Sequence, residues 1–231
     1  MSIINSIRSL LPHIAPIPLS EKIRSGLAGG TAIFLLAFAL KYLPHGTYPL
    51  LMLGSMAASA APLFAAPHSP FAQPWNLIGG HLLSALAGWL TILFIHDPLI
   101  AAGVAVGAAI FLMHYFNCLH PPGAATALTL VLSSTQFESH GWQWVLLVVA
   151  INAGISLLLA LLINNMLPSR QYPIPHTPPA PPKPGPFIAL EQHDLEWALV
   201  QMKGVIDISE EYLAEIYKLA LHRAQERSEA S

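Results

Sequence analysis

The sequence predicts an all-α membrane protein, a polytopic transmembrane helical bundle of about six crossings that includes one short broken helix. Apolar residues make up 54% of the 231 residues, and the mean hydropathy is +0.56. Charged residues make up 10%, against about 25% in typical soluble chains. Between Ser25 and Ser169 the only charged residues are Lys41, Asp97 and Glu138. Such uncharged stretches are typical of segments that span a bilayer.

Composition divides the chain into four parts. We expect an N-terminal arm at 1–22, a transmembrane domain at 23–168, a proline-rich linker at 169–186 and a cytoplasmic helical tail at 187–231. A chain rich in proline forms an extended, semi-rigid spacer. The tail holds most of the acidic residues, and two short helices of its size bury little area alone. We therefore expect the tail to dock on another surface.

The crossings follow apolar stretches close to the length of about 20 residues that spans a bilayer core. We expect them at about 23–43 and 48–64, then, after a proline-punctuated loop at 66–76, a third that runs to about 95, a fourth at 98–116, a short one ending near 132, and a last one at 141–162. Basic residues flank this set on both sides: Arg8, Lys22 and Arg24 before it, Arg170 and Lys183 after it. Under the positive-inside rule both termini are then cytoplasmic, which requires an even number of crossings. No signal peptide is expected, because no apolar core with a cleavage site begins the sequence.

One stretch, Asn117 to Leu130, interrupts the apolar pattern. It contains His120 followed by Pro121 and Pro122. Proline is unfavourable inside a helix because it lacks an N–H and its ring clashes with the preceding turn, but it suits the first turn. The sequence therefore predicts a break at His120 and a short helix that begins near Pro122. A broken helix at membrane depth is tolerated where it is buried or lines a wet cavity, as in a transporter or channel.

Three functions remain open for this break. The first is an anion path, because the N–H groups of residues 123–125 begin a helix without intrahelical acceptors and the helix dipole is positive there. His120 would add a donor or a proton. The second is a metal route through the eleven histidines, but the spans are nearly free of carboxylates and the only thiol is Cys118, so the metal signal is weak. The third is structural, with His120 bonding a freed carbonyl.

The candidate substrate-binding residues lie around the break and in an earlier proline-rich loop. His114, Asn117 and His120 have a spacing that predicts one shared helix face. The candidates are His120, Pro121, Pro122, Gly123, Ala124, Ala125, Thr126, Asn117, His68, Ser69, Asn76 and His81. No cofactor, metal ligand or catalytic set is predicted, and we do not expect an enzyme, since no nucleophile–base–acid set or phosphate loop is recognisable.

Small residues recur at four-residue spacing within the predicted spans. Gly80, Ser84 and Gly88 form one such series, and Gly103 and Gly107 form another. Small residues at this spacing let helix backbones approach closely. We expect this packing within one chain, with a homo-oligomer interface as the alternative.

Three sequence blocks resemble, in order, the HPP family of integral membrane proteins, over about residues 20–175. The blocks are 65–85, 120–128 and 162–173. After the two prolines the family order is expected to be Ala-Gly-Ala-Thr, whereas this chain has Gly-Ala-Ala-Thr at 123–126. The family is usually described with four spans.

The resemblance implies a function and a location. Plant members are linked to nitrite transport, so the expected partners are a small inorganic anion such as nitrite and the lipid bilayer, without nucleic acid. The expected location is the inner membrane of a bacterium. Many bacterial members carry a pair of CBS domains, and this chain resembles only the lead-in to them, at 194–199 and 207–211.

Overall fold

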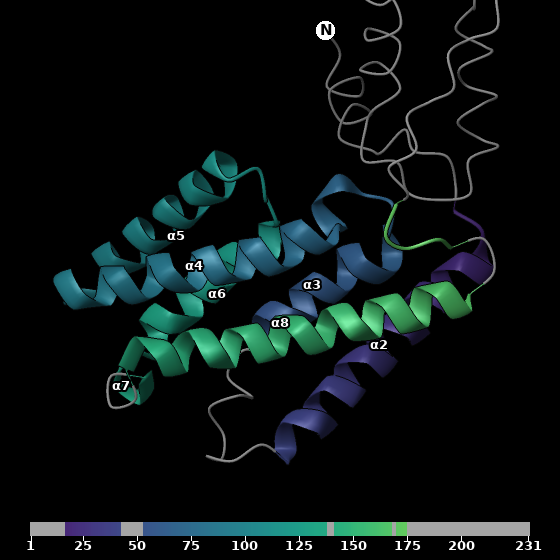
Figure 1. The fold of residues 1–231 in the computed structure, drawn as a ribbon, viewed down its shortest axis with the longest axis horizontal. Helices are drawn as coiled ribbons and strands as arrows, with labels where there is room; N and C mark the ends of the chain where they lie inside the picture. Colours follow the sequence, from purple (N-terminus) through teal and green to yellow (C-terminus); the bar gives the residue numbers. More distant parts are fainter. Residues whose placement is uncertain (1–16, 43–52, 138–140, 168–169, 175–231) are drawn as a thin grey trace, which may run out of the picture. The chain divides into compact units, whose positions relative to one another are not determined.

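In the computed structural model the described residues are 17–42, 53–137, 141–167 and 170–174. These residues form α-helices and one 3-10 turn, and the predicted all-α fold class is confirmed (Figure 1). The elements are α2 (Leu19–Lys41), α3 (Leu53–Ala65), η2 (Pro70–Ala72), α4 (Pro74–Phe94), α5 (Pro98–Tyr115), α6 (Pro121–Leu132), α7 (Ser134–Phe137) and α8 (Gly141–Met166). The predicted tail, most of the predicted arm and most of the predicted linker lie outside the described residues.

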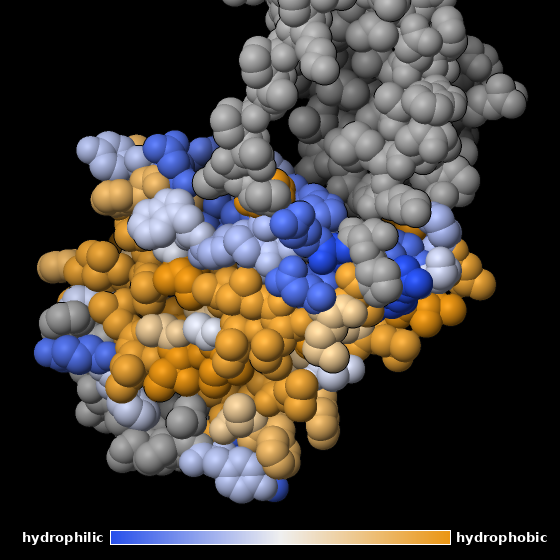
Figure 2. Space-filling model, turned by 45° about the vertical axis from the view of Figure 1, so that its right-hand side comes forward, coloured by the Kyte–Doolittle hydropathy of each residue, from blue (hydrophilic) through white to orange (hydrophobic). Residues whose placement is uncertain are grey.

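Helix lengths divide the bundle into long and short members. Four helices, α2, α4, α5 and α8, are long and apolar enough to cross a membrane. Helix α3 has 13 residues and α6 has 12, so at 1.5 Å per residue each is only about 18–20 Å long, against about 30 Å of hydrocarbon. Figure 2 shows that hydrophobic residues cover most of one face of the described helices. The protein is therefore a multi-pass membrane protein. Among the described residues, α2, α4, α5 and α8 are long enough to span the bilayer, α6 is shorter, and α3 is described from Leu53 onward.

Helices that follow one another in the sequence run in alternating directions. Contacts between α4 and α6 show that these two run the same way, because Gly80 lies beside His120 and Gly88 lies beside Ala127. Shared core clusters agree with alternating directions. For α2 and α3, Ala32 shares a cluster with Phe64 and Leu40 shares another with Met56. For α4 and α8, Leu77 shares a cluster with Ala160 and Ala85 shares another with Val145. The beginning of α2 and the end of α8 therefore share one end of the bundle, as an even number of crossings requires.

Packing of the bundle continues beyond the end of α8. Arg170 donates from Nη1 to the Phe64 carbonyl oxygen at 2.7 Å and from Nη2 to the Ser25 hydroxyl at 2.9 Å. The Tyr172 side chain is 2% exposed and donates its hydroxyl to the Ala72 carbonyl oxygen at 2.7 Å. Burial raises the pKa of the Tyr172 hydroxyl. Residues 170–174, which the composition assigned to the linker, thus belong structurally to the helical bundle.

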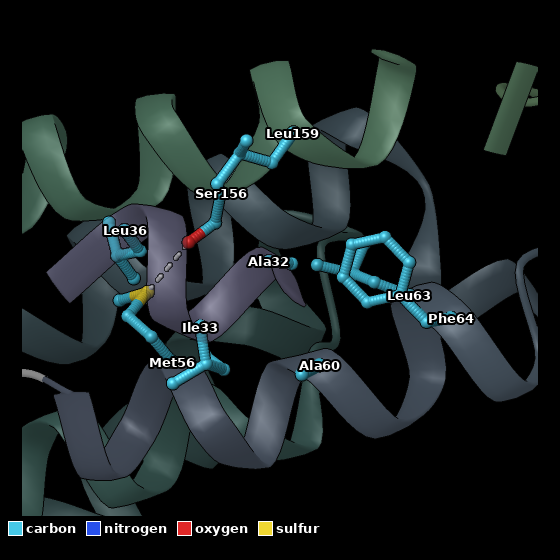
Figure 3. A pocket seen from close by; sticks show the side chains of 9 residues that line it. All are labelled: Ala32, Ile33, Leu36, Met56, Ala60, Leu63, Phe64, Ser156 and Leu159. Atoms are coloured by element: carbon cyan, nitrogen blue, oxygen red, sulfur yellow. Dashed lines mark hydrogen bonds between the residues drawn. The ribbon is translucent and has the colours of Figure 1, made fainter. Parts of the chain in front are cut away.

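A small pocket lies between α2, α3 and α8 (Figure 3). It is lined by Ala32, Ile33, Leu36, Met56, Ala60, Leu63, Phe64, Ser156 and Leu159. The lining is apolar apart from Ser156, whose hydroxyl donates to the Met56 sulfur at 3.5 Å. This side of the bundle is therefore held mainly by apolar packing.

Candidate functional site

Helix α6 begins inside the bundle rather than at its edge. A Cβ added to Gly80 would lie 2.6 Å from the Cβ of His120, the residue that precedes α6. Gly80 lies six residues into α4, which begins at Pro74, and six residues of α-helix rise about 9 Å. The start of α6 is therefore about 9 Å deeper than the start of α4, at the predicted break.

The chain descends to this depth through a non-helical segment, residues 116–120. Side chains at the start of α4 bind its carbonyl groups: Trp75 Nε1 donates to the Phe116 oxygen at 3.2 Å, and Asn76 Nδ2 donates to the Leu119 oxygen at 2.8 Å. These bonds satisfy two carbonyl groups of a segment that has no regular helical hydrogen bonds. Asn76, predicted as a substrate contact, thus anchors the descending segment.

The predicted shared face of His114, Asn117 and His120 is wrong. Helix α5 ends at Tyr115, and Asn117 has a φ of 51°, a left-handed conformation that asparagine tolerates better than most residues. The helical periodicity stops there, so His114 and Asn117 are exposed while His120 is buried. The reason is the pair of prolines, which begin a new helix instead of continuing α5.

Ser59 of α3 lies between two histidine rings. Its hydroxyl oxygen is 2.9 Å from Nε2 of His81 in α4 and 3.0 Å from Nε2 of His120. The rings meet edge to face, with centroids 5.1 Å apart. All these side chains are 0% exposed. Three elements far apart in the sequence are thus joined by one hydroxyl group.

Both outer ring nitrogens also have partners. His81 Nδ1 is 2.7 Å from the Thr126 hydroxyl in α6, and His120 Nδ1 is 2.7 Å from the carbonyl oxygen of Phe71 in η2. Thr126 is 0% exposed. We call Ser59, His81, His120 and Thr126 the histidine cluster. It ties α3, α4, α6 and the η2 turn together at the level where α6 begins.

The partners determine the directions of these hydrogen bonds when both rings are neutral. A carbonyl oxygen only accepts, so His120 carries its proton on Nδ1 and its Nε2 accepts. The Ser59 hydroxyl has one proton, which satisfies His120 Nε2 when it is donated there and not to the Ser55 carbonyl oxygen at 3.1 Å. His81 must consequently donate from Nε2 to Ser59, and its Nδ1 accepts from Thr126. The cluster is therefore a one-directional chain from Thr126 to the Phe71 carbonyl.

A second polar feature lies directly beside the start of α6. The Ser84 hydroxyl of α4 is fully buried and has no hydrogen-bond partner among the residues that the structure describes. It is 3.0 Å from the position that a Cβ on Gly123 would take. The Gly123 N–H, predicted to be unsatisfied, donates to the His120 carbonyl oxygen at 2.8 Å. One of the predicted free donors is thus taken, since the first turn closes on the residue before the helix.

The remaining predicted substrate-binding residues lie in different surroundings. Pro121 and Pro122 occupy the first turn of α6, and Pro122 is buried. Ser69 is buried, and its hydroxyl accepts from the Phe71 N–H at 3.3 Å, which shapes the turn that presents the Phe71 carbonyl. His68 is exposed. Ala124 and Ala125 are half-buried on α6.

Sequence reasoning did not select Ser59, Ser84 or the Phe71 carbonyl as site groups. Ser59 and Ser84 are small polar residues in apolar helices, a pattern that also serves ordinary helix packing. The Phe71 carbonyl belongs to the backbone and leaves no mark in the residue type. One signal was available: a buried histidine in a span needs a partner on each ring nitrogen.

Among the residues of the described ranges, no group of three or more His, Cys, Asp or Glu side chains is arranged to hold a metal ion. Cys118 is buried beside Gly79, and a Cβ on that glycine would lie 3.1 Å from the Cys118 sulfur.

Known membrane proteins are similar to most of this chain. The transmembrane region of the HPP family matches residues 14–173. The chain belongs to the HPP family. A transmembrane protein of Dictyostelium discoideum is 38% identical over 164 residues, which cover 69% of this chain and 57% of that protein. A second transmembrane protein of that organism is 40% identical over 129 residues, or 54% of this chain and 41% of its own length. This HPP chain thus spans about half the length of the curated relatives it matches, and no solved structure matches it.

Proposed function

We propose that this HPP protein carries a small monovalent inorganic anion across the membrane, with nitrite as the expected substrate, and that the anion passes the start of α6. The observation that carries the proposal is the buried Ser84 hydroxyl beside Gly123, which has no partner among the described residues. A buried polar group is normally satisfied. A hydroxyl donor next to a helix start, where the dipole is positive, suits an anion.

The neutral character of the surroundings supports a monovalent ion that is held weakly. The four residues of the histidine cluster can all be neutral, and α4 and α6 contain no Lys, Arg, Asp or Glu. An anion at a helix start gains roughly 0.3–2 kcal/mol from the dipole. Such weak binding suits transport, because the protein must release what it binds. The proposal includes no catalysed reaction.

The test is anion flux in liposomes that contain the purified full chain. Nitrite, nitrate, chloride and a divalent metal ion are compared, with protein-free liposomes measuring the leak of nitrous acid through lipid. We expect nitrite flux in the natural protein and a reduction of about tenfold in Ser84→Ala, the change that corresponds to about 1.4 kcal/mol of lost interaction. Ser156→Ala is the matched control, since it removes a buried serine hydroxyl beside Met56.

His120→Ala separates this function from a structural role of the break. If His120 contributes to transport, its loss should abolish or sharply reduce nitrite uptake while the protein still assembles. Normal nitrite flux in His120→Ala would mean that His120 has a structural role, in which it holds η2 through the Phe71 carbonyl oxygen. Absence of flux for every anion in the natural protein would overturn the proposed function, and metal flux without anion flux would favour a metal route.

A further inference from the structure

The two imidazole rings of the histidine cluster share the hydroxyl group of Ser59. This shared partner suggests a further site. Both Nε2 atoms address the Ser59 oxygen, at 2.9 and 3.0 Å. A third neighbour is the Ser55 carbonyl oxygen, at 3.1 Å from the same hydroxyl. The Ser59 proton therefore has a choice between a ring nitrogen and a backbone carbonyl.

We propose that Ser59, His81 and His120 form a binding site for one transferable proton, and that this proton moves together with the transported anion. In the neutral cluster the Ser59 hydroxyl donates to His120 Nε2. When a proton is added, His120 carries one on each ring nitrogen, and its Nε2 donates to the Ser59 oxygen. The Ser59 hydroxyl then donates to the Ser55 carbonyl oxygen where His81 keeps its Nε2 proton, or to His81 Nε2 where His81 carries its proton on Nδ1. No heavy atom has to move, because all partners already stand at hydrogen-bond distance.

The chain of bonds also provides a route for that proton. A proton that arrives at the Thr126 oxygen releases the Thr126 proton to His81 Nδ1. The His81 Nε2 proton then passes to Ser59, and the Ser59 proton passes to His120 Nε2. One proton enters and one is bound, with the cluster gaining one positive charge. The Thr126 end lies on α6, the helix beside which we propose the anion.

The site holds one proton rather than two. A second proton would make His81 cationic as well, with a proton on both Nδ1 and Nε2. Two cationic rings would then stand with centroids 5.1 Å apart, and like charges in an apolar interior repel strongly. The expected stoichiometry is therefore one proton taken up with one monovalent anion.

Among the residues that the structure describes, the hydrogen-bond partners of the two histidines are uncharged. On α3 it meets Ser55 and Ser59, on α6 Thr126, and on η2 the Phe71 carbonyl. Helix α5 contributes Met113 beside Gly80, and α8 has no titratable residue in its sequence. The remaining titratable neighbour is Cys118, which packs on Gly79. The two histidines are thus the groups that can take the proton.

The first test reads the site without transport. Nitrogen NMR of ¹⁵N-histidine-labelled full-length protein in detergent reports which ring nitrogen carries the proton, with His81→Gln and His120→Gln assigning the signals. We expect His120 protonated on Nδ1 and His81 on Nε2 at neutral pH, and one proton taken up by the pair on acidification. The same tautomer on both rings, or independent titration of each ring that Ser59→Ala leaves unchanged, would overturn the proton site.

The second test concerns coupling, which rests on the proposed anion transport. Nitrate and nitrite uptake into liposomes is measured with and without an inward proton gradient, while a pH-sensitive dye inside reports proton entry. We expect one proton to enter per anion. The uptake driven by the proton gradient should fall at least about tenfold in Ser59→Ala, and it should not fall in Ser156→Ala.

The outcomes of the two tests are distinguishable. Anion flux that ignores the proton gradient in the natural protein would overturn coupling and leave the proposed function intact. Absence of all anion flux would overturn both the proposed function and the coupling, and the NMR signature would then decide the proton site alone.

Discussion

Two series of small residues at four-residue spacing, Gly80, Ser84 and Gly88 on α4 and Gly103 and Gly107 on α5, have opposite surroundings in this protein. On α4, a Cβ at Gly80 would lie 2.6 Å from His120 Cβ, and one at Gly88 would lie 2.8 Å from the Ala127 carbonyl oxygen. On α5, nothing lies within 4 Å of the Cβ positions of Gly103 and Gly107. The small residues of α4 allow α6 to pack closely against it, whereas Gly103 and Gly107 face away from the other described helices.

The difference teaches what the small residues on α4 do for function. With backbones this close, His81 reaches Thr126 at 2.7 Å and the Ser84 hydroxyl reaches the start of α6. A longer separation between the helices would open both contacts. The α4 glycines therefore set the geometry of the histidine cluster, and the α5 glycines do not touch it.

The largest effect is expected from Gly80→Ala. The new methyl group would meet the His120 Cβ, the Cys118 carbonyl oxygen and the Met113 sulfur at 2.6, 3.2 and 3.4 Å. Overpacking of this kind costs about 1–3 kcal/mol, and here the displaced residue is the one that begins α6. We expect a clear fall in the thermal unfolding temperature in detergent and loss of the opposite histidine tautomers in the NMR spectrum. An unchanged unfolding temperature would contradict the close approach of the two helices.

A smaller effect is expected from Gly88→Ala, two turns further along α4. Its methyl group would press on the Ala127 backbone at 2.8 and 3.0 Å and on Leu130 at 3.2 Å. The clash again costs about 1–3 kcal/mol, but it falls on Ala127, the residue after Thr126, and not on His120. We expect a lower unfolding temperature with the His81 and His120 tautomers retained. Loss of the tautomers in this variant would mean that the helices move as one unit.

Much of the helical fold could be predicted from the sequence, for a physical reason. Apolar length and proline positions predicted starts at Pro98 and near Pro122, and α5 and α6 begin at Pro98 and Pro121. Helix α4 begins at Pro74, earlier than predicted, because proline suits the first turn of a helix. The short helix after the break was also predicted. Residues 170–174 were not assigned to the bundle, because a proline-rich composition does not reveal that Tyr172 is buried against Ala72.

The candidate site was only partly predictable. His81, His120 and Thr126 were selected, and they meet in the structure. Their meeting point, Ser59, was not selected, because its neighbours are distant in the sequence and its residue type is common in packed membrane helices. Both His68 and His81 were selected, but His68 is exposed and His81 is buried. Tertiary packing decides which of them is buried, and local sequence does not encode it.

The smallest effect is expected from Gly103→Ala combined with Gly107→Ala, provided that lipid covers this face of α5. Alanine is a better helix former than glycine by up to about 1 kcal/mol per residue, and nothing in the chain lies close enough to clash. We expect an equal or slightly higher unfolding temperature and an unchanged native mass in detergent. Gly154→Ala on α8 is the matched control, since its Cβ position is equally open. If a second copy of the chain packs on the α5 glycines instead, the double variant should lower the unfolding temperature and the oligomer mass while Gly154→Ala does neither. That result would extend the close-packing role from α4 to α5 and place it between subunits.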